Sequence, residues 1–361
     1  MARAYNFFAG PAVLPLPALE RAQKELIDWA GTGTSVLETS HRSKEYDAVH
    51  NEAIALLKEF LALDEHYHVL FLQGGATLQF AMVPMNLLGR DQAADYVNTG
   101  HWAKKAMTDA KLFGTVKVAY DGSGNKFTHI PAQNELVLDP HARYVHITSN
   151  NTIEGTQYHT FPATGRVPLV CDMSSDFLWR PFDVRPFGII YAGAQKNLGP
   201  AGVTVVIVRD DVLAACKAEN PTLLKYATHA ENNSLYNTPP VFAIYLVRNV
   251  LAYMKDIGGL KKIEELNRRK AGMIYETIDA RPDFFRAPVE KASRSMMNIV
   301  FRLPSEELEA KFVAEAKARR MLGLKGHRSV GGIRISAYNS CPMEAVESVV
   351  GFMKDFAKAN A

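Results

Sequence analysis

The sequence is poor in the features that mark three large classes of protein: paired cysteines, long apolar runs and an excess of one charge. Three cysteines among 361 residues, with no Cys-x-x-Cys pair, argue against a disulfide scaffold and favour reduced thiols. No stretch approaches the roughly 18 uninterrupted apolar residues of a membrane span, and the first residues lack the apolar core of a signal peptide. We therefore expect a cytoplasmic protein without a membrane partner.

The low net charge and the absence of glycine-rich nucleotide-binding motifs argue against two further classes of function. The formal net charge is only +3 and the basic residues are scattered, which argues against nucleic-acid binding. The one short basic run, Asn267-Arg268-Arg269-Lys270, falls in a helical pattern and is interpreted as a solvated face. The chain has neither a Gly-x-Gly-x-x-Gly fingerprint nor a P-loop, so a Rossmann dehydrogenase is disfavoured. We expect no metal site.

The chain is otherwise an ordinary globular sequence, with 47% hydrophobic and 22% charged residues. Short apolar runs alternate with helical patterns up to residue 256, which predicts βαβ units and a mainly parallel sheet with helices on both faces. The short Gly-Pro turn between the last two runs favours an antiparallel step, so we expect a mixed sheet. Strands are predicted at residues 68–72, 94–98, 115–120, 144–148, 167–172, 188–192 and 203–208.

Helices in this region are predicted from apolar residues that recur every three or four positions. The first such pattern extends from Leu19 to Trp29, and the second covers residues 44–62. The second helix is expected to face inward with Ala48, Ile54, Leu57 and Phe60. Further helices are predicted at residues 76–88, 102–113 and 239–256.

The pattern changes after Gly258-Gly259, which suggests a second domain. Helices are predicted at 260–278, 305–321 and 342–359, and strands at 298–303 and 332–336. The length of the chain also favours about two domains. We therefore predict an α/β fold in which a large domain, 15–256, is followed by a smaller α+β domain, 257–361, with residues 1–14 packed on the smaller one.

Lys196 stands between two apolar runs and immediately before a Gly-Pro turn. Asp172 ends the apolar run that precedes the first of these two. Both side chains could therefore lie at strand ends on one edge of the sheet, where open α/β sheets bind ligands. An amine and a carboxylate beside one crevice suit pyridoxal phosphate, because the lysine forms a Schiff base and the carboxylate keeps the pyridine nitrogen protonated. Considered alone, Lys196 is better interpreted as a surface lysine at a turn.

Residues after other strands could hold the same cofactor. Gly74-Gly75-Ala76-Thr77 follows a strand and opens a helix, whose N-terminus favours a phosphate, although a plain turn has the same pattern. Trp102 could stack on the pyridine ring, or it could pack its helix against the core. Asn150-Asn151-Thr152 could contact the ring hydroxyl or cap a turn.

Several motifs occur in order from residue 6 to the C-terminal helix. The set is Asn6-Phe7, Gly10-Pro11-Ala12, Thr34-Ser35-Val36, Ser40-His41-Arg42, Gln195-Lys196-Asn197, Gly199-Pro200-Ala201-Gly202, Asn237-Thr238-Pro239-Pro240, Lys325-Gly326-His327-Arg328 and Gly331-Gly332-Ile333-Arg334. Together it resembles the phosphoserine aminotransferase family, which consists of fold-type I, class V pyridoxal-phosphate enzymes. The resemblance implies a homodimer and ping-pong transamination between glutamate and 3-phosphohydroxypyruvate in serine biosynthesis, and in many bacteria also a step of pyridoxine biosynthesis.

The resemblance also implies roles for single residues. Lys196 would bind the cofactor covalently, Asp172 would pair with its pyridine nitrogen, and Trp102 would stack on its ring. The other cofactor contacts would come from Ala76, Thr77, Thr152 and Gln195, and from Asn237 and Thr238 of the partner subunit. The substrate would be held by Arg334 at its α-carboxylate and, at its far anion, by His41, Arg42, His327 and Arg328. Thr77 is a departure, because some family members carry arginine there.

Three alternatives remain open at this point. A serine–glyoxylate type transaminase would share the lysine and aspartate, but it has no reason for two His-Arg pairs. A cysteine desulfurase needs a nucleophilic cysteine on a mobile loop, whereas Cys341 directly precedes a helix that Pro342 would start. A non-catalytic binding protein on this fold would not need Lys196, Asp172 and Trp102 together.

Overall fold

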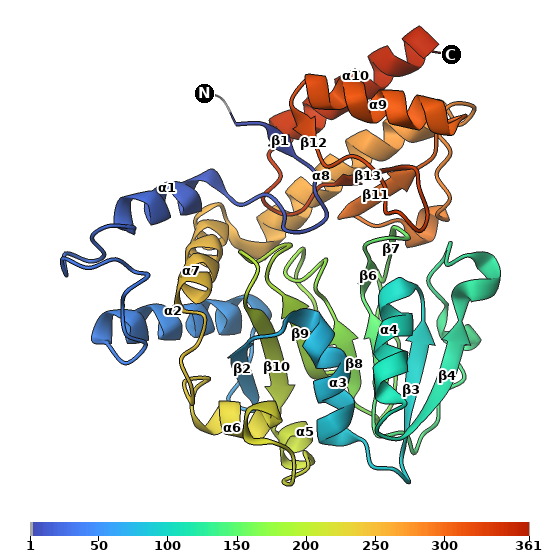
Figure 1. The fold of residues 1–361 in the computed structure, drawn as a ribbon. Coiled ribbons are helices and arrows are strands. Elements are labelled where there is room, and N and C mark those ends of the chain that lie inside the picture. Colours follow the sequence, from blue (N-terminus) through green and yellow to red (C-terminus); the bar gives the residue numbers. More distant parts are fainter. Residues whose placement is uncertain (1–2, 361) are drawn as a thin grey trace.

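A seven-stranded sheet organises the larger part of the chain in the computed structural model, which describes residues 3–360 (Figure 1). The strand order is β2-β10-β9-β8-β5-β3-β4. Strands β9, β8, β5, β3 and β4 are parallel, whereas β10 runs antiparallel to both of its neighbours. The strands are β2 (Tyr67–Leu72), β3 (Ala93–Asn98), β4 (Thr115–Asp121), β5 (Val145–Thr148), β8 (Leu169–Asp172), β9 (Phe187–Gly193) and β10 (Thr204–Arg209). The predicted mixed α/β sheet, with its antiparallel step at the Gly-Pro turn, is confirmed.

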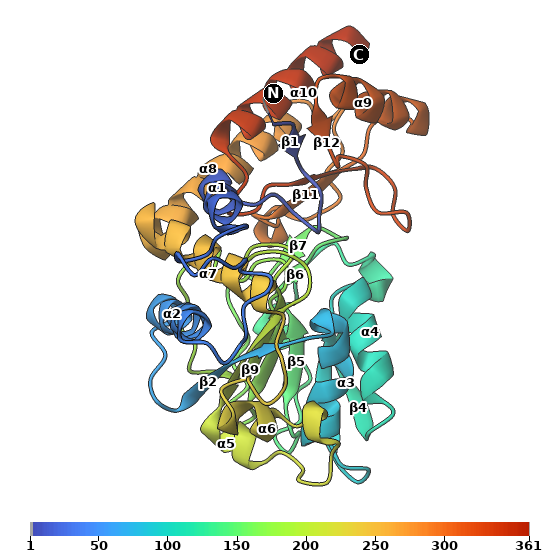
Figure 2. The ribbon, with the colours of Figure 1, turned by 60° about the vertical axis from the view of Figure 1, so that its left-hand side comes forward.

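Helices cover both faces of this sheet, as Figures 1 and 2 show from two sides. Strand β10 illustrates why: Val205 and Ile207 belong to one apolar core, and Val206 and Val208 belong to another on the opposite face. Side chains alternate along a strand, so a strand that is apolar at every position must be covered twice. The covering helices are α2 (Lys44–Leu61) and α7 (Val241–Asp256) on one side and α3 (Gly75–Leu87) and α4 (His101–Ala110) on the other, with α1 (Leu16–Glu25), α5 (Asp210–Ala214) and α6 (Tyr226–Glu231) at the periphery.

The chain beyond α7 forms a smaller α+β region at the top of Figure 1. Its elements are α8 (Gly259–Asp279), β11 (Asn298–Phe301), α9 (Glu306–Ala318), β12 (Met321–Leu322), β13 (Ile333–Ser336) and α10 (Met343–Asn360). Strands β11 and β13 pair antiparallel, and the N-terminal strand β1 (Tyr5–Asn6) pairs in parallel with β12. Phe7 is buried in the same apolar core as Phe301. The division into domains at residues 256 and 257 stays a prediction.

Two details of the predicted helices are wrong. The first helix ends at Glu25 rather than Trp29, and Trp29 is buried for another reason, because its ring packs at 6.1 Å from that of Tyr245. In α2, Ala48 is exposed, and the helix buries Val49 and Ala53 instead. Alanine is a weak marker of a buried face, since its small side chain is tolerated on either side of a helix.

The prediction of a solvated face at residues 267–270 is also wrong. Asn267 and Lys270 are buried in α8, and only Arg268 and Arg269 point to solvent. The two buried residues are three positions apart and share the helix face of Ile263 and other apolar side chains. None of the helices in residues 3–360 is both long and apolar enough to cross a membrane. Within the same range, no cluster of three or more histidine, cysteine or acidic side chains could hold a metal ion.

Candidate active site

One cavity lies where β2, β3, β5, β8 and β9 end. Its lining residues are Gly75, Ala76, Thr77, Phe80, Trp102, Thr148, Asn150, Thr152, Asp172, Ser174, Ser175, Gln195 and Lys196. The residues predicted to bind the cofactor within one chain therefore lie around a single space. They meet because the parallel strands all deliver their carboxyl ends to the same edge of the sheet.

The Lys196 amine faces this cavity from the segment that follows β9. Its Nζ donates a hydrogen bond to Thr152 Oγ1 at 2.8 Å and lies 6.0 Å from the centre of the Trp102 ring. Withdrawal from water lowers the pKa of Lys196 to about 8; the nearby Asp172 opposes this effect and Arg334 adds to it. A lysine with such a pKa is partly uncharged near neutral pH, which is what a nucleophile or a general base requires.

Asp172, the last residue of β8, is only 5% exposed. Its Oδ1 accepts a hydrogen bond from the Ser174 N–H at 2.9 Å. Burial raises the pKa of Asp172, while the hydrogen bonds from Ser174 and the charge of Lys196 work in the opposite direction. A buried carboxylate is stabilised by a cation at close range, so this position suits a protonated pyridine nitrogen.

Other groups around the cavity have unused hydrogen-bonding or stacking capacity. Trp102 Nε1 and Thr148 Oγ1 are buried without a hydrogen-bond partner. Helix α3 begins at Gly75 without a side-chain cap, so its first N–H groups can bind an anion. A Cβ atom on Gly74 would lie 2.5 Å from Leu78 Cδ2, which explains the glycine at this turn. An amine, a carboxylate, an aromatic ring and an open helix N-terminus together fit pyridoxal phosphate.

Arg334, on β13 in the smaller region, contacts Thr152 in the wall of the cavity. Its Nη1 donates to the Thr152 carbonyl at 3.3 Å, and its Nε is buried without a partner. Burial is the main cause that lowers the pKa of this guanidinium. Arg334 and Lys196 therefore both bind Thr152, and Arg334 keeps donors free for a carboxylate.

A group of cationic and imidazole side chains lies beyond Arg334. The rings of His101 and His327 are 5.9 Å apart. Burial lowers the pKa of both histidines, and the neighbouring cations, Arg328 and Lys105 among them, lower it further. One carboxylate lies beside the group, because Glu154 accepts a hydrogen bond from the His101 N–H at 2.9 Å. The arginines and lysines around the two imidazoles still favour an anionic ligand. His101 was missed by the sequence reasoning, although it directly precedes Trp102.

Four predicted residues do not join this group within the chain. Among residues 3–360, no hydrogen bond, ion pair or ring contact links His41 or Arg42 to His327 or Arg328. Asn237 lines a different cavity, and the carbonyl of Thr238 accepts a hydrogen bond of 3.4 Å from Gln73 Nε2. Gln73 lies just before the α3 N-terminus, so the 237–238 segment is on the outer side of that turn.

Comparison with known proteins gives matches over nearly the whole chain. Residues 4–349 match the model of the aminotransferase class-V family. The chain is 55% identical to the phosphoserine aminotransferase of Lysinibacillus sphaericus, with 98% of each chain covered, and 54% identical to that of Niallia circulans, with 99% covered. The solved phosphoserine aminotransferase from Bacillus circulans subsp. alkalophilus superposes with a TM-score of 0.98 at 53% identity over 99% of each chain. A PLP-bound phosphoserine aminotransferase from Trichomonas vaginalis gives 0.92 at 41% identity, over 98% of this chain and 100% of that one.

Proposed function

The chain belongs to the aminotransferase class-V family, and we propose that it is a phosphoserine aminotransferase that uses pyridoxal phosphate. The observation that carries the proposal is the single cavity in which Lys196, Asp172 and Trp102 meet, with Arg334 beside them. The PLP-bound relative supports the same cofactor. The reaction would transfer the amino group of glutamate to 3-phosphohydroxypyruvate and yield phosphoserine and 2-oxoglutarate.

Each residue around the cavity would have a separate role in the transfer of the amino group. Pyridoxal phosphate supplies an electron sink for the breaking Cα–H bond. Lys196 would bind the cofactor until the substrate amine displaces it. The freed amine would then move the proton from the substrate Cα to the cofactor carbon C4′, first as a general base and then as a general acid. Asp172 would keep the ring nitrogen protonated, and Trp102 would stack on the ring. The remaining cofactor contacts would come from Thr152, Gln195 and the N–H groups of Ala76 and Thr77.

The substrate would be held at both of its anionic ends. Arg334 would bind the α-carboxylate, and its free donors suit that role. His327 and Arg328 would bind the phosphate, or the side-chain carboxylate when glutamate occupies the site. His41 and Arg42, which have no contact with this pair in their own chain, would approach the same anion from a second subunit.

We further propose that the enzyme is a homodimer. Asn237 and Thr238 have exposed side chains and do not line the cavity of their own chain, which leaves them available to the cofactor phosphate of a partner subunit. Association and cofactor affinity would then be linked. Sedimentation at decreasing concentration should show cofactor loss together with dissociation, whereas a fully active monomer with tightly bound cofactor would contradict shared sites.

The function is tested by two half-reactions followed by absorbance. Glutamate should remove the visible band of the holoenzyme, and 3-phosphohydroxypyruvate should restore it with formation of phosphoserine. Serine and glyoxylate serve as the comparison pair for the rival transaminase. A holoenzyme that responds to these two but not to phosphohydroxypyruvate would overturn the proposal. A desulfurase is disfavoured, because Cys341 is 4% exposed and burial raises the pKa of its thiol to about 11.

Substrate specificity is tested with Arg42→Ala and Arg328→Ala. A charge-assisted contact to phosphate is worth roughly 1.5–3 kcal/mol, so each variant should lose about 10–100-fold in kcat/KM for phosphohydroxypyruvate. Glutamate should suffer as well, but alanine should be almost unaffected, because its side chain has no anion. Equal losses on alanine would mean that these arginines support the fold or the cofactor.

The cellular role follows from the same assignment. The product places the enzyme in serine biosynthesis, and the related step of pyridoxine biosynthesis is a second role for the same site. A cytoplasmic location is part of the proposal, and the three unpaired cysteines support it.

A further inference from the structure

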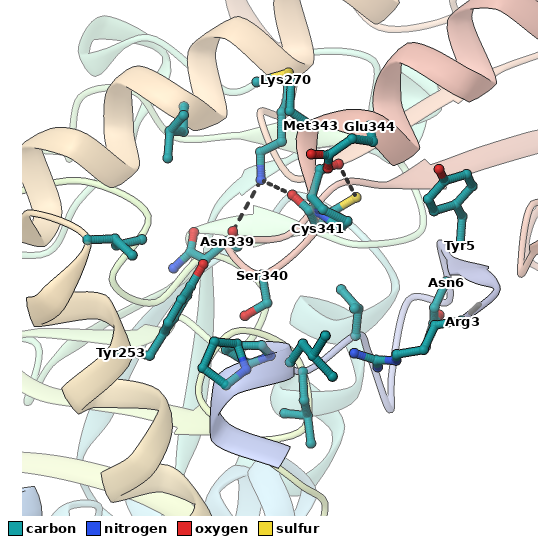
Figure 3. Close-up of a pocket in the computed structure, with 18 of the residues that line it drawn as sticks. Arg3, Tyr5, Asn6, Tyr253, Lys270, Asn339, Ser340, Cys341, Met343 and Glu344 are labelled. Atoms are coloured by element: carbon teal, nitrogen blue, oxygen red, sulfur yellow. Dashed lines mark hydrogen bonds between the residues drawn. The ribbon is translucent and has the colours of Figure 1, made fainter. Parts of the chain in front are cut away.

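A turn behind the cavity, Tyr338–Cys341, connects β13 to α10. It begins only four residues after Arg334, so a shift of the turn would pull on the end of β13, which on its other side pairs with β11. One side of the turn borders a second cavity of about 460 Å³, which is also lined by the N-terminal residues 3–6 and 13–17 (Figure 3). Tyr338 and Cys341, at the two ends of the turn, are buried in apolar clusters. The backbone between them borders this space, so hydrogen bonds help to set its position.

Lys270 supplies the densest set of these hydrogen bonds. The side chain is 1% exposed, and its Nζ donates to the Tyr338 carbonyl at 2.6 Å. It also donates to the carbonyls of Asn339 at 3.4 Å and Cys341 at 3.3 Å (Figure 3). An ammonium group has three protons, and here each one has a carbonyl partner. The lysine thus fixes the backbone of the turn and has no donor left for a ligand.

The turn is linked in the other direction to the residue beside Lys196. The Asn339 N–H donates to Asn197 Oδ1 at 3.0 Å, and Asn197 Nδ2 donates to the Phe177 carbonyl at 3.1 Å. Asn267, one turn before Lys270 on α8, donates to Asn339 Oδ1 at 2.8 Å. A continuous set of hydrogen bonds therefore joins α8, the turn and the segment that carries Lys196.

We propose that Lys270 is a positioning residue that sets Arg334 relative to Lys196 by holding the Tyr338–Cys341 turn. The substrate in this inference is taken from the proposed function. The statement that Lys270 holds the turn does not depend on that function. A misplacement of about 1 Å at an active site can reduce the rate by up to roughly 100-fold. Loosening the turn would move Arg334 and weaken the grip on the α-carboxylate, while the amine of Lys196 would stay intact.

The structural part is tested by amide hydrogen exchange in the cofactor-free protein. Lys270→Met keeps most of the side-chain volume but removes the three donors, so exchange at the Asn339 N–H should accelerate about tenfold or more. The control is Lys261→Met on the exposed face of the same helix, which should leave Asn339 unchanged. If Lys270→Met does not fold, Lys270→Gln leaves two donors on a shorter side chain and should accelerate the same amide to a smaller extent. Unchanged exchange at Asn339 in the folded variant would overturn the proposal.

The functional part is tested by a double-mutant cycle on the glutamate half-reaction. Lys270→Met should reduce kcat/KM roughly tenfold, mainly through a higher KM, and should add less than about twofold in an Arg334→Ala background. An equal loss in both backgrounds would mean that Lys270 supports only the fold, and would overturn its positioning role. A wild-type enzyme that does not react with glutamate would instead refute the proposed function, while the exchange experiment would still decide the role of Lys270 in the turn.

Discussion

Lys196 and Lys270 show how two regions of one protein use the same physical effect differently. Withdrawal from water lowers the pKa of each lysine to about 8. Lys196 has one hydrogen bond, to the Thr152 hydroxyl, and faces an open cavity. Lys270 has three hydrogen bonds to carbonyls and is only 1% exposed, although its side chain also borders the second cavity. The comparison teaches that neither a lowered pKa nor a neighbouring cavity identifies a catalytic lysine by itself; unused donor capacity distinguishes the two.

The largest difference in activity is expected between the variants Lys196→Ala and Lys270→Met. In the proposed mechanism, removal of Lys196 would eliminate both the covalent bond to the cofactor and the proton carrier, so turnover should fall by several orders of magnitude. The fold should persist, because the side chain has a single polar partner in the protein. Single-turnover rates and circular dichroism would check this. A Lys196→Ala enzyme within tenfold of wild type, or a Lys270→Met enzyme that is equally inactive, would remove the distinction.

Asp172, the carboxylate near Lys196, provides a second test of the difference between the two lysines. Asp172→Asn keeps the shape and the acceptor for the Ser174 N–H but removes the charge. A single electrostatic group in a water-excluded site contributes about 10²–10³-fold to the rate, and we expect a loss of that size in the glutamate half-reaction. Cofactor content, measured by absorbance, should fall less. An unchanged single-turnover rate would show that Asp172 is only a strand-end carboxylate.

Chemical labelling of the cofactor-free protein sharpens the comparison without any catalysis. Reductive alkylation requires the neutral amine, and the neutral fraction of a lysine with a pKa of about 8 approaches its maximum near pH 9. The labelling rate of Lys196 should therefore level off there, whereas exposed lysines should continue to gain about tenfold per pH unit. Lys270 should react at least ~10-fold more slowly than Lys196, because the structure around its amine must first open locally to admit the reagent. Peptide mass spectrometry gives the three rates, and equal labelling of Lys196 and Lys270 would contradict the structure.

The sequence predicts the sheet well because its strands are continuous apolar runs bounded by glycine, proline or polar residues. The strand predicted at 203–208 is observed at Thr204–Arg209, and its antiparallel direction follows from the short turn before it. The end of α1 was not predictable in this way. Trp29 has the correct spacing for a helix, but its burial depends on Tyr245, which no local pattern contains.

The same distinction applies to the candidate site. Lys196, Asp172 and Trp102 could be proposed from the sequence, because each one lies at or shortly after the end of a strand and the ends of parallel strands converge. Lys270 was misread, since a basic run in a helix usually faces solvent. The carbonyls that bind it belong to a turn about 70 residues later, so the reason for its burial lies in the tertiary structure. The spacing of Asn267 and Lys270 with Ile263 was the one local signal.

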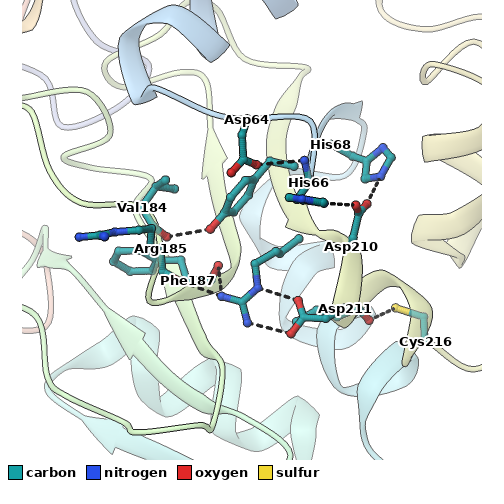
Figure 4. A network of polar contacts seen from close by, with 12 residues as sticks. Asp64, His66, His68, Val184, Arg185, Phe187, Asp210, Asp211 and Cys216 are labelled. Atoms are coloured by element: carbon teal, nitrogen blue, oxygen red, sulfur yellow. Dashed lines mark hydrogen bonds and ion pairs between the residues drawn. The ribbon is translucent and has the colours of Figure 1, made fainter.

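The smallest effect is expected from Asp210→Asn, in a polar network at the end of β2 and β10 that is opposite to the cavity (Figure 4). Asp210 accepts hydrogen bonds from His66 Nδ1 at 3.1 Å and His68 Nε2 at 2.7 Å, and the His66 and Asp210 side chains are exposed. The hydrogen bond between Asp210 and His66 lowers the pKa of the carboxyl and raises that of the imidazole.

The direction of each pKa shift determines the pH range in which this network stabilises the fold. The Asp210 contribution to stability is present above its unfolded pKa of about 4 and is lost as the pH falls. The His66 contribution is present below its unfolded pKa of about 6.5 and is lost as the pH rises through its raised value. Asp210→Asn should therefore lower the melting temperature slightly at pH 5, hardly at pH 8, and less in high salt, because exposed charges are screened. kcat/KM should not change. A loss of activity approaching that of Asp172→Asn would show that the two ends of the sheet are coupled. Unused hydrogen-bonding capacity would then no longer distinguish the residues of the cavity from those of a paired surface network.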